Sequence, residues 1–174
     1  MLKFLPKFKF YPARALWLLV SLGIIILDQL SKYWAMGALF FEQPKLIIPG
    51  VFNFYLDFNQ GAAFSFLNHA GFWGGVFFLS LAVLISLICI FILLSKERGP
   101  RGFGFFLLGL ALIIGGALGN AIDRLRLTHV IDFIQWHWKD YYWPTFNIAD
   151  SAICLAVFFI ILSEILKNKK VSKK

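Results

Sequence analysis

The sequence is poor in acidic residues and cysteine, and it lacks the common metal and nucleophile motifs. Nine Asp and Glu stand against 17 Lys and Arg among 174 residues, which gives a formal net charge of +8. Cys89 and Cys154 lie inside apolar runs with no Cys-x-x-Cys pair, so a disulfide or cysteine metal site is not expected. The sequence has no His-Glu-x-x-His motif of zinc proteases and no Gly-x-Ser-x-Gly motif of serine hydrolases. We therefore expect no metal, no cofactor and no protease of either type.

Apolar residues are abundant instead. They make up 60% of the chain, against roughly 45–50% in soluble domains. Phe alone occurs 21 times, and the mean hydropathy is +0.76. Basic residues gather beside the apolar stretches, which is typical of the cytoplasmic loops of a membrane protein and does not indicate nucleic-acid binding. The composition therefore predicts an integral membrane protein.

Four apolar stretches are long enough to cross a bilayer: residues 15–39, 71–94, 102–122 and 148–165. The first follows a basic tail and could be the core of a secretory signal peptide. Asp28 and Lys32 occupy the place of its cleavage region, however, and further spans follow, which favours an uncleaved helix. We expect one all-α membrane domain over residues 1–174, with extracytoplasmic loops at 40–70 and 123–147.

The first of these loops has a different pattern. Asn53, Tyr55 and Asp57 alternate with Phe and Leu, and this period of two predicts strands, so we expect a small extracytoplasmic β-rich region. Residues 133–143 are rich in Trp and Tyr, which are enriched where a protein meets the membrane surface. We expect that second segment to lie at the interface.

The distribution of basic residues predicts the orientation in the cell membrane. Most Lys and Arg lie in the two terminal tails and in the loop at 96–101. Because basic loops stay in the cytoplasm, both termini are expected there. The third span then ends, and the fourth begins, on the outer side. The carboxylates and amides near those ends are expected to gather near the outer leaflet.

Asp28 and Lys32 are four residues apart, so they share a face of the first helix and can pair. The pair could be a salt bridge that makes insertion tolerable, or it could contact substrate. Because a Lys stem can extend toward the interface and Asp cannot, we expect loss of Asp28 to do more harm than loss of Lys32.

Three further carboxylates stand close to the outer ends of the third and fourth spans. Asp123 precedes Arg124, which favours an ion pair or a cap over catalysis. Asn147 and Asp150 have the spacing of an N-cap and N3 pair, so capping and catalysis both remain open for Asp150. Asp132 lies in Val-Ile-Asp-Phe-Ile with no adjacent base. An unpartnered carboxylate in apolar surroundings has a raised pKa, which suits a general acid.

Two carboxylates held close together share one proton. The ionised one can take a proton from water while the protonated one polarises a carbonyl, so we expect an aspartyl protease. The alternative is a non-enzymatic membrane transporter or lipid-binding protein. A transporter would place polar groups on both sides of the membrane midplane, whereas here they gather on one side.

Five stretches, in this order along the chain, resemble the bacterial lipoprotein signal peptidases, also called type II signal peptidases: 28–32, 59–65, 115–124, 130–133 and 146–151. They read Asp-Gln-Leu-Ser-Lys, Asn-Gln-Gly-Ala-Ala-Phe-Ser, Gly-Gly-Ala-Leu-Gly-Asn-Ala-Ile-Asp-Arg, Val-Ile-Asp-Phe and Phe-Asn-Ile-Ala-Asp-Ser. The four-span layout of that family covers nearly the whole chain.

The resemblance implies an aspartyl endopeptidase of the bacterial inner membrane. It would cleave prolipoproteins on the N-terminal side of a diacylglyceryl-modified Cys and release the signal peptide. The catalytic pair maps onto Asp132 and Asp150. The residues expected to bind substrate or support the site are Asp28, Lys32, Asn59, Gly61, Asn120, Asp123, Arg124 and Asn147. The expected partners are lipid-modified prolipoproteins and membrane lipids, with no nucleic acid, and we expect a monomer.

Overall fold

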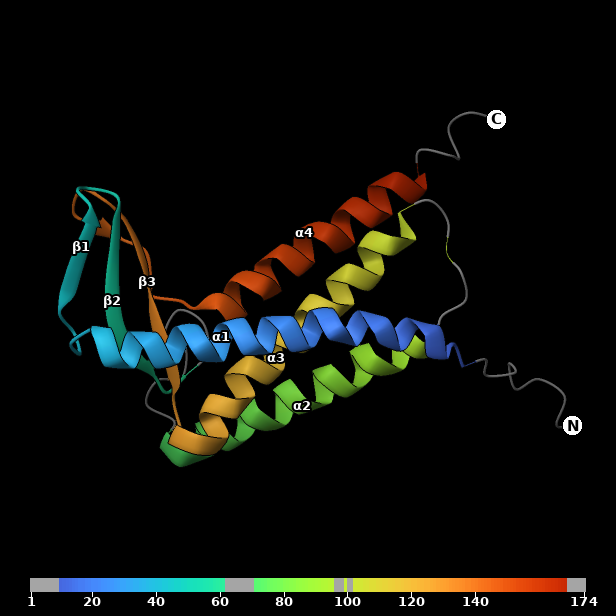
Figure 1. The fold of residues 1–174 in the computed structure, drawn as a ribbon, viewed down its shortest axis with the longest axis horizontal. Helices are drawn as coiled ribbons and strands as arrows, with labels where there is room; N and C mark the ends of the chain where they lie inside the picture. Colours follow the sequence, from blue (N-terminus) through green and yellow to red (C-terminus); the bar gives the residue numbers. More distant parts are fainter. Residues whose placement is uncertain (1–9, 62–70, 96–98, 100–101, 169–174) are drawn as a thin grey trace, which may run out of the picture.

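The computed structural model describes residues 10–61, 71–95, 99 and 102–168. Its elements are a short 3-10 helix η1 (Pro12–Trp17), the helices α1 (Leu18–Ala38), α2 (Gly71–Ser95), α3 (Phe103–Leu127) and α4 (Ile148–Asn168), and the strands β1 (Pro44–Ile48), β2 (Phe52–Asn59), β3 (Val130–Trp138) and β4 (Tyr141–Tyr142). Figure 1 shows the strands at one end of the helices, running across the helix direction. The start of α1 and the end of α4 lie at the opposite end of the bundle.

The predicted fold class is confirmed. Four helices in the described part of the chain are long and apolar enough to cross a membrane, and a small antiparallel sheet accompanies them. The boundary that matters for the site is the end of α3, which continues past the predicted end of its span at 122 to Leu127. Asp123 and Arg124 therefore lie on the last turns of a helix, where their side chains are held in fixed directions, and not in a loop.

Helix α3 lies at the centre of the bundle and packs against the other three helices. Small residues at its contact positions allow this close approach. A Cβ added at Gly115 would lie 2.9 Å from the backbone oxygen of Ser21 on α1. A Cβ at Gly119 would lie 2.8 Å from Oδ2 of Asp28. The four-residue spacing of these two glycines therefore allows α1 and α3 to approach closely.

Helix α1 is polar toward the protein and apolar toward lipid. Its buried residues are Ser21, Asp28, Lys32 and Ala35, and their spacing places them on one face of the helix. The Ser21 hydroxyl donates a hydrogen bond of 2.8 Å to the Ala111 carbonyl on α3. Exposed Leu and Ile side chains cover the rest of the helix. Polar groups inside a membrane bundle are costly unless they are paired, so this face marks the start of the site.

The strands form one sheet in the order β1-β2-β3-β4, and each pairs antiparallel with the next. The strands predicted in the first extracytoplasmic loop correspond to β1 and β2, and the predicted alternation of Asn53, Tyr55 and Asp57 falls in β2. An irregularity in β2 between Phe54 and Asp57 changes the register opposite β3, and it leaves Asp57 directly opposite Asp132. The aromatic segment at 133–143, expected only to lie at the interface, forms most of β3 and all of β4.

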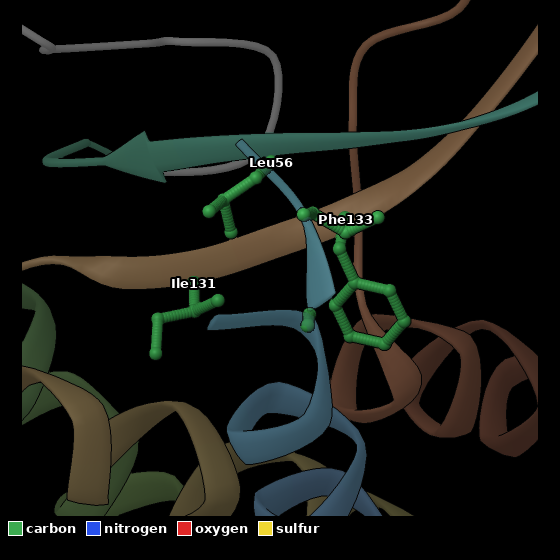
Figure 2. Close-up of a cluster of buried hydrophobic side chains, with 5 residues drawn as sticks. Leu56, Ile131 and Phe133 are labelled. Carbon is green, nitrogen blue, oxygen red and sulfur yellow. The ribbon is translucent and has the colours of Figure 1, made fainter. Parts of the chain in front are cut away.

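A hydrophobic cluster attaches the sheet to the end of α1. Figure 2 shows Leu56 of β2 with Ile131 and Phe133 of β3, and the cluster is completed by Ala35 and Leu39. Successive side chains of a strand point to opposite faces. Because Ile131 and Phe133 both point into this cluster, Asp132 between them points to the other face of the sheet.

Candidate active site

Lys32 lies at the centre of a buried ionic network. Its side chain is 2% exposed, and its ammonium group has three N–H donors. Nζ lies 2.8 Å from Oδ2 of Asp28, 2.7 Å from Oδ2 of Asp123 and 2.9 Å from Oδ1 of Asn120. All three donors therefore have a partner. The predicted Asp28–Lys32 pair is present, but Lys32 points into the bundle and does not extend toward the interface.

The prediction for Asp123 is wrong in its partner. Among the described residues, Asp123 pairs with Lys32 and not with Arg124. Its Oδ1 also accepts a hydrogen bond of 2.8 Å from the Gln29 side chain, and its Oδ2 accepts one of 3.2 Å from the Ile131 backbone N–H. Asp123 thus connects α3 to α1 and to the start of β3, which gives it a structural role next to the site.

The start of α4 has the predicted capping arrangement. The Asn147 side chain oxygen accepts a hydrogen bond of 2.9 Å from the Asp150 backbone N–H, while Oδ2 of Asp150 accepts one of 3.3 Å from the Asn147 backbone N–H. This reciprocal pair satisfies two backbone donors at the helix start. Asp28 satisfies another, because its Oδ1 accepts a hydrogen bond of 2.9 Å from the Ala149 backbone N–H.

Asp150 also accepts a hydrogen bond of 2.8 Å from the Asn120 side chain on α3. The amide of Asn120 has a defined orientation, because its oxygen accepts a hydrogen bond from the Lys32 ammonium group and its nitrogen donates one to Asp150. Capping and catalysis are therefore compatible for Asp150. Its backbone N–H and Oδ2 form the cap, and Oδ1 lies against the amide of Asn120.

Asp132 is brought to the same place from the sheet. Asp132 is 1% exposed. The sequence predicts no partner for its carboxyl group, but two side-chain amides donate hydrogen bonds to it. Asn147 donates to Oδ1 at 2.6 Å and Asn59 donates to Oδ2 at 3.1 Å. Burial, together with the negative charge of Asp150 nearby, raises the pKa of Asp132 to about 8. The raised pKa expected from the sequence is thus retained despite the two donors.

A second group of contacts holds the segment that follows β2. The Arg124 guanidinium donates a hydrogen bond of 2.7 Å to the Gly61 carbonyl, and the Gly61 backbone N–H donates one of 2.9 Å to the Asn59 side chain. Gly61 is itself buried. Arg124 on α3 therefore fixes the end of the segment that supplies Asn59 to Asp132. The rest of the matching stretch, residues 62–65, lies outside the described residues.

Sequence reasoning missed Gln29. Its side chain nitrogen donates to Asp123 at 2.8 Å, to Asp28 at 3.2 Å and to the Gly119 carbonyl at 3.2 Å. It therefore joins the two carboxylates that flank Lys32. The available signal was its place inside the Asp-Gln-Leu-Ser-Lys stretch, but an uncharged side chain next to two charged ones was not singled out.

The described residues bring the expected site together from four elements. Asp28 and Lys32 come from α1, Asn120, Asp123 and Arg124 from α3, Asp132 from β3, and Asp150 from α4, while Asn59, Gly61 and Asn147 lie at or beside strand and helix ends. Within that part of the chain, no group of three or more His, Cys, Asp or Glu residues could hold a metal ion. The functional groups of the site are thus carboxylates and amides arranged around one ammonium group.

Comparisons with known proteins identify the family of this chain. Residues 20–166 match the family described as Signal peptidase (SPase) II. A lipoprotein signal peptidase of Coxiella burnetii (strain RSA 493 / Nine Mile phase I) is 49% identical over 150 residues, covering 86% of this chain and 90% of that protein. One from Xanthomonas campestris pv. campestris (strain 8004) is 46% identical over 162 residues, covering 93% and 95%.

A solved structure described as a bacterial membrane enzyme, determined by the in meso method at 2.3 Å resolution, has a similar fold. It shares 27% sequence identity with this chain, and the superposition has a TM-score of 0.77 and covers 97% of each chain. A second such structure, at 1.9 Å resolution, gives a TM-score of 0.71 with 27% identity, covering 91% of this chain and 97% of the other.

Proposed function

Because this chain belongs to the signal peptidase II family, we propose that Asp132 and Asp150 are the two carboxylates with which it cleaves prolipoprotein signal peptides. The protein is an aspartic endopeptidase and a multi-pass protein of the bacterial inner membrane. The alternative of a non-enzymatic transporter or lipid-binding protein is not favoured. The observation that carries the assignment is that one residue, Asn147, donates to both carboxyl groups, from its side-chain nitrogen to Asp132 and from its backbone N–H to Asp150.

Asp132 is the general acid in this proposal and Asp150 the general base. Because the pKa of Asp132 is raised to about 8, its carboxyl group is protonated at neutral pH and can donate a hydrogen bond to the scissile carbonyl. Asp150 is ionised, and its charge is stabilised by hydrogen bonds from Asn120 and from the Asn147 backbone.

The two carboxylates hydrolyse the bond in two steps. Asp150 takes a proton from water as the water oxygen bonds to the carbonyl carbon, and Asp132 gives its proton to the carbonyl oxygen, which produces a gem-diol. Asp150 then gives its proton to the leaving nitrogen as the C–N bond breaks. Asp132 recovers a proton from one hydroxyl of the gem-diol, so both groups return to their starting states.

The other site residues position these two groups. Lys32 orients the Asn120 amide toward Asp150, and Arg124 holds the Gly61 carbonyl so that Asn59 reaches Asp132. The substrate is proposed to be a diacylglyceryl-modified prolipoprotein, cut on the N-terminal side of the lipidated Cys. We place both termini in the cytoplasm and the site near the outer leaflet. The count of basic residues supports this, as do the start of α1 and the end of α4, which lie far from the sheet.

We also propose that the chain acts as one membrane domain and as a monomer in contact with membrane lipids. The packing of α3 against every other membrane helix and of the sheet against α1 supports the single domain. Native mass spectrometry from detergent tests the oligomeric state, and a dimer mass would contradict it.

The experiment that tests the catalytic assignment is single-turnover cleavage of a lipidated prolipoprotein by Asp132→Asn, Asp150→Asn and the double variant. Each single variant should abolish cleavage, and the double variant should resemble either one, because the two residues act as a unit. Asp140→Asn is the matched control, since Asp140 is exposed in the turn between β3 and β4. Asp123→Asn should retain turnover. A folded, inactive Asp123→Asn protein beside an active Asp132→Asn protein would assign the pair to Asp123 and Asp150.

A further inference from the structure

Arg14 is a buried cation at the end of the bundle opposite the sheet, and the catalytic mechanism does not use it (Figure 1). The residue is 8% exposed and lies on η1, which leads directly into α1. Its outer guanidinium nitrogens, Nη1 and Nη2, are buried and have no hydrogen-bond partner among the described residues. By contrast, all three donors of the buried Lys32 ammonium group have acceptors. A buried charge without a partner is costly, so the donors of Arg14 indicate a ligand that accepts from them.

Two aromatic rings hold this guanidinium in place without accepting its hydrogen bonds. Cζ of Arg14 lies 4.3 Å from the centroid of the Tyr11 ring and 5.1 Å from that of the Phe103 ring. The Tyr11 backbone N–H donates a hydrogen bond of 2.9 Å to the Leu94 carbonyl, so η1 is tied to the end of α2 and lies beside the start of α3. A cation–π contact attracts the positive charge, but the N–H donors in the plane of the guanidinium still require an acceptor.

The start of α3, whose first residue is Phe103, is also positive and lacks a cap. Its N-cap residue, Gly102, has no side chain to cap it, and its first turn contains no acidic residue. The first N–H groups of a helix have no partner within it, and together they carry about half a positive charge. A Cβ added at Gly104 would meet no heavy atom of the described residues within 4 Å, so the backbone there is open to a ligand. The guanidinium and the helix start together favour an anion.

The position of Arg14 along its helix favours a lipid as the source of the anion. The first candidate membrane span runs from Pro12 to Ala38, so Arg14 lies in its first turn, at the level where hydrocarbon gives way to phosphate groups. Exposed apolar side chains lie on both neighbouring helical segments at this end, namely those of Leu16, Leu19 and Phe105. A phospholipid can contact the cationic groups and this apolar surface at once, whereas a free anion can contact only the cationic groups.

We propose that Arg14 and the start of α3 bind the phosphate group of an anionic phospholipid, from the leaflet at the end of the bundle opposite the sheet. The planar guanidinium donates two parallel hydrogen bonds to phosphate oxygens, and the first N–H groups of α3 donate to the same group. Because Nη1 and Nη2 are buried, one of the two covering rings turns aside as the lipid enters. The bound lipid then ties η1 to α3. The proposal does not depend on the assignment of Asp132 and Asp150, which lie at the other end.

Thermal unfolding in neutral detergent, titrated with phosphatidylglycerol, tests the site. A ligand of the folded state raises the unfolding temperature, so that of the wild type should rise with phosphatidylglycerol and rise less with phosphatidylcholine, whose choline offsets the phosphate charge. Arg14→Met keeps an unbranched apolar stem but has no donor, and it should require roughly tenfold more phosphatidylglycerol, or more, for the same rise. Lys167→Met is the matched control, because it removes an exposed positive charge near the end of α4, at the same end of the bundle, and it should respond like the wild type.

The same measurements without added lipid separate this proposal from a purely structural role of Arg14. Without phosphatidylglycerol, Arg14→Met should be at least as stable as the wild type, because a buried charge without a partner has been removed, and with phosphatidylglycerol the wild type should be the more stable. An equal loss of stability in both conditions would mean that the chain itself supplies the partner, for example from the loop at 96–101, and would overturn the proposal. An equal response of Arg14→Met and the wild type to phosphatidylglycerol would also overturn it. Inorganic phosphate should have little effect, and a rise equal to that with phosphatidylglycerol would assign the site to a free anion instead of a lipid.

Discussion

Replacing Lys32 with Met tests whether the ammonium group holds the site together. Met fills most of the volume of the Lys stem but carries no charge and no donor. The change leaves two buried carboxylates, those of Asp28 and Asp123, without the cation that lies 2.8 Å and 2.7 Å from them. It also leaves the Asn120 amide without the donor that fixes its orientation.

The expected loss of stability follows from the burial of these charged groups. Removing one partner of a buried ion pair costs about 3–5 kcal/mol, because the remaining charge stays out of water. That is a large share of a typical stability of about 5–15 kcal/mol, and for a chain of this length it should lower the unfolding temperature by roughly 10 °C. Contrary to the expectation from the reach of the Lys stem toward the interface, loss of Lys32 should then do at least as much damage as loss of Asp28.

The matched control is Lys167→Met. Lys167 lies 2.8 Å from Glu164, but the two side chains are 51% and 60% exposed. An exposed pair contributes about 0–1 kcal/mol, so the unfolding temperature should hardly change. Because the Lys32–Asp28 and Lys167–Glu164 pairs have the same N–O distance of 2.8 Å, a difference in unfolding temperature between the two Lys→Met variants reports the effect of burial.

The assay is thermal unfolding of the purified protein in detergent, followed by tryptophan emission, together with single-turnover cleavage. Adding Asp28→Asn to Lys32→Met should recover part of the lost stability, because removing a whole buried pair costs less than breaking it. An unfolding temperature for Lys32→Met within the error of Lys167→Met would refute the reasoning. The reasoning would also be refuted if the Lys32→Met/Asp28→Asn double variant were less stable than Lys32→Met by as much as Asp28→Asn alone destabilises the wild type.

Three further predictions concern pH, packing and metals. The pKa of Asp132 is raised from 3.8 to about 8 in the folded protein, so between these values the folded state holds a proton that the unfolded state releases. The resulting contribution to stability is complete below pH 4 and is lost as the pH rises through 8. Unfolding temperatures measured across this range should therefore fall for the wild type and fall less for Asp132→Asn. Gly119→Ala should lower both stability and cleavage, at a cost of about 1–3 kcal/mol, because its Cβ would lie 2.8 Å from Oδ2 of Asp28; a variant as stable and active as the wild type would show that α1 moves freely. Cleavage should persist in EDTA, because the proposed chemistry uses two carboxyl groups, and loss of activity restored by zinc would contradict it.

Patterns within a few residues of one another were sufficient to predict much of the site. The four-residue spacing predicts the Asp28–Lys32 pair, and the three-residue spacing predicts the capping contacts of Asn147 with Asp150. Both arise from helix geometry, which repeats in every protein. The apolar neighbours of Asp132 likewise predict its burial.

Contacts between distant segments could not be predicted in the same way. The hydrogen bond from Gln29 to Asp123 joins residues 94 positions apart, and it depends on how closely α1 and α3 pack. The prediction paired Asp123 with the base next to it in sequence, although neighbouring residues of a helix point in different directions. The aromatic stretch at 133–143 lacks a simple alternation, so its strands depend on pairing, of β3 with β2 and of β4 with β3, and not on its own pattern.

The arrangement of β3 has an evolutionary consequence. Ile131 and Phe133 face the hydrophobic cluster while Asp132 faces the site, so inserting or deleting one residue between Val130 and Asp132 would exchange the two faces. A carboxylate would enter the cluster and a phenylalanine would take its place beside Asn147. Descendants of this gene should therefore tolerate changes of length in the turn at Lys139 and Asp140, whereas the spacing of the first four residues of β3 should stay constant.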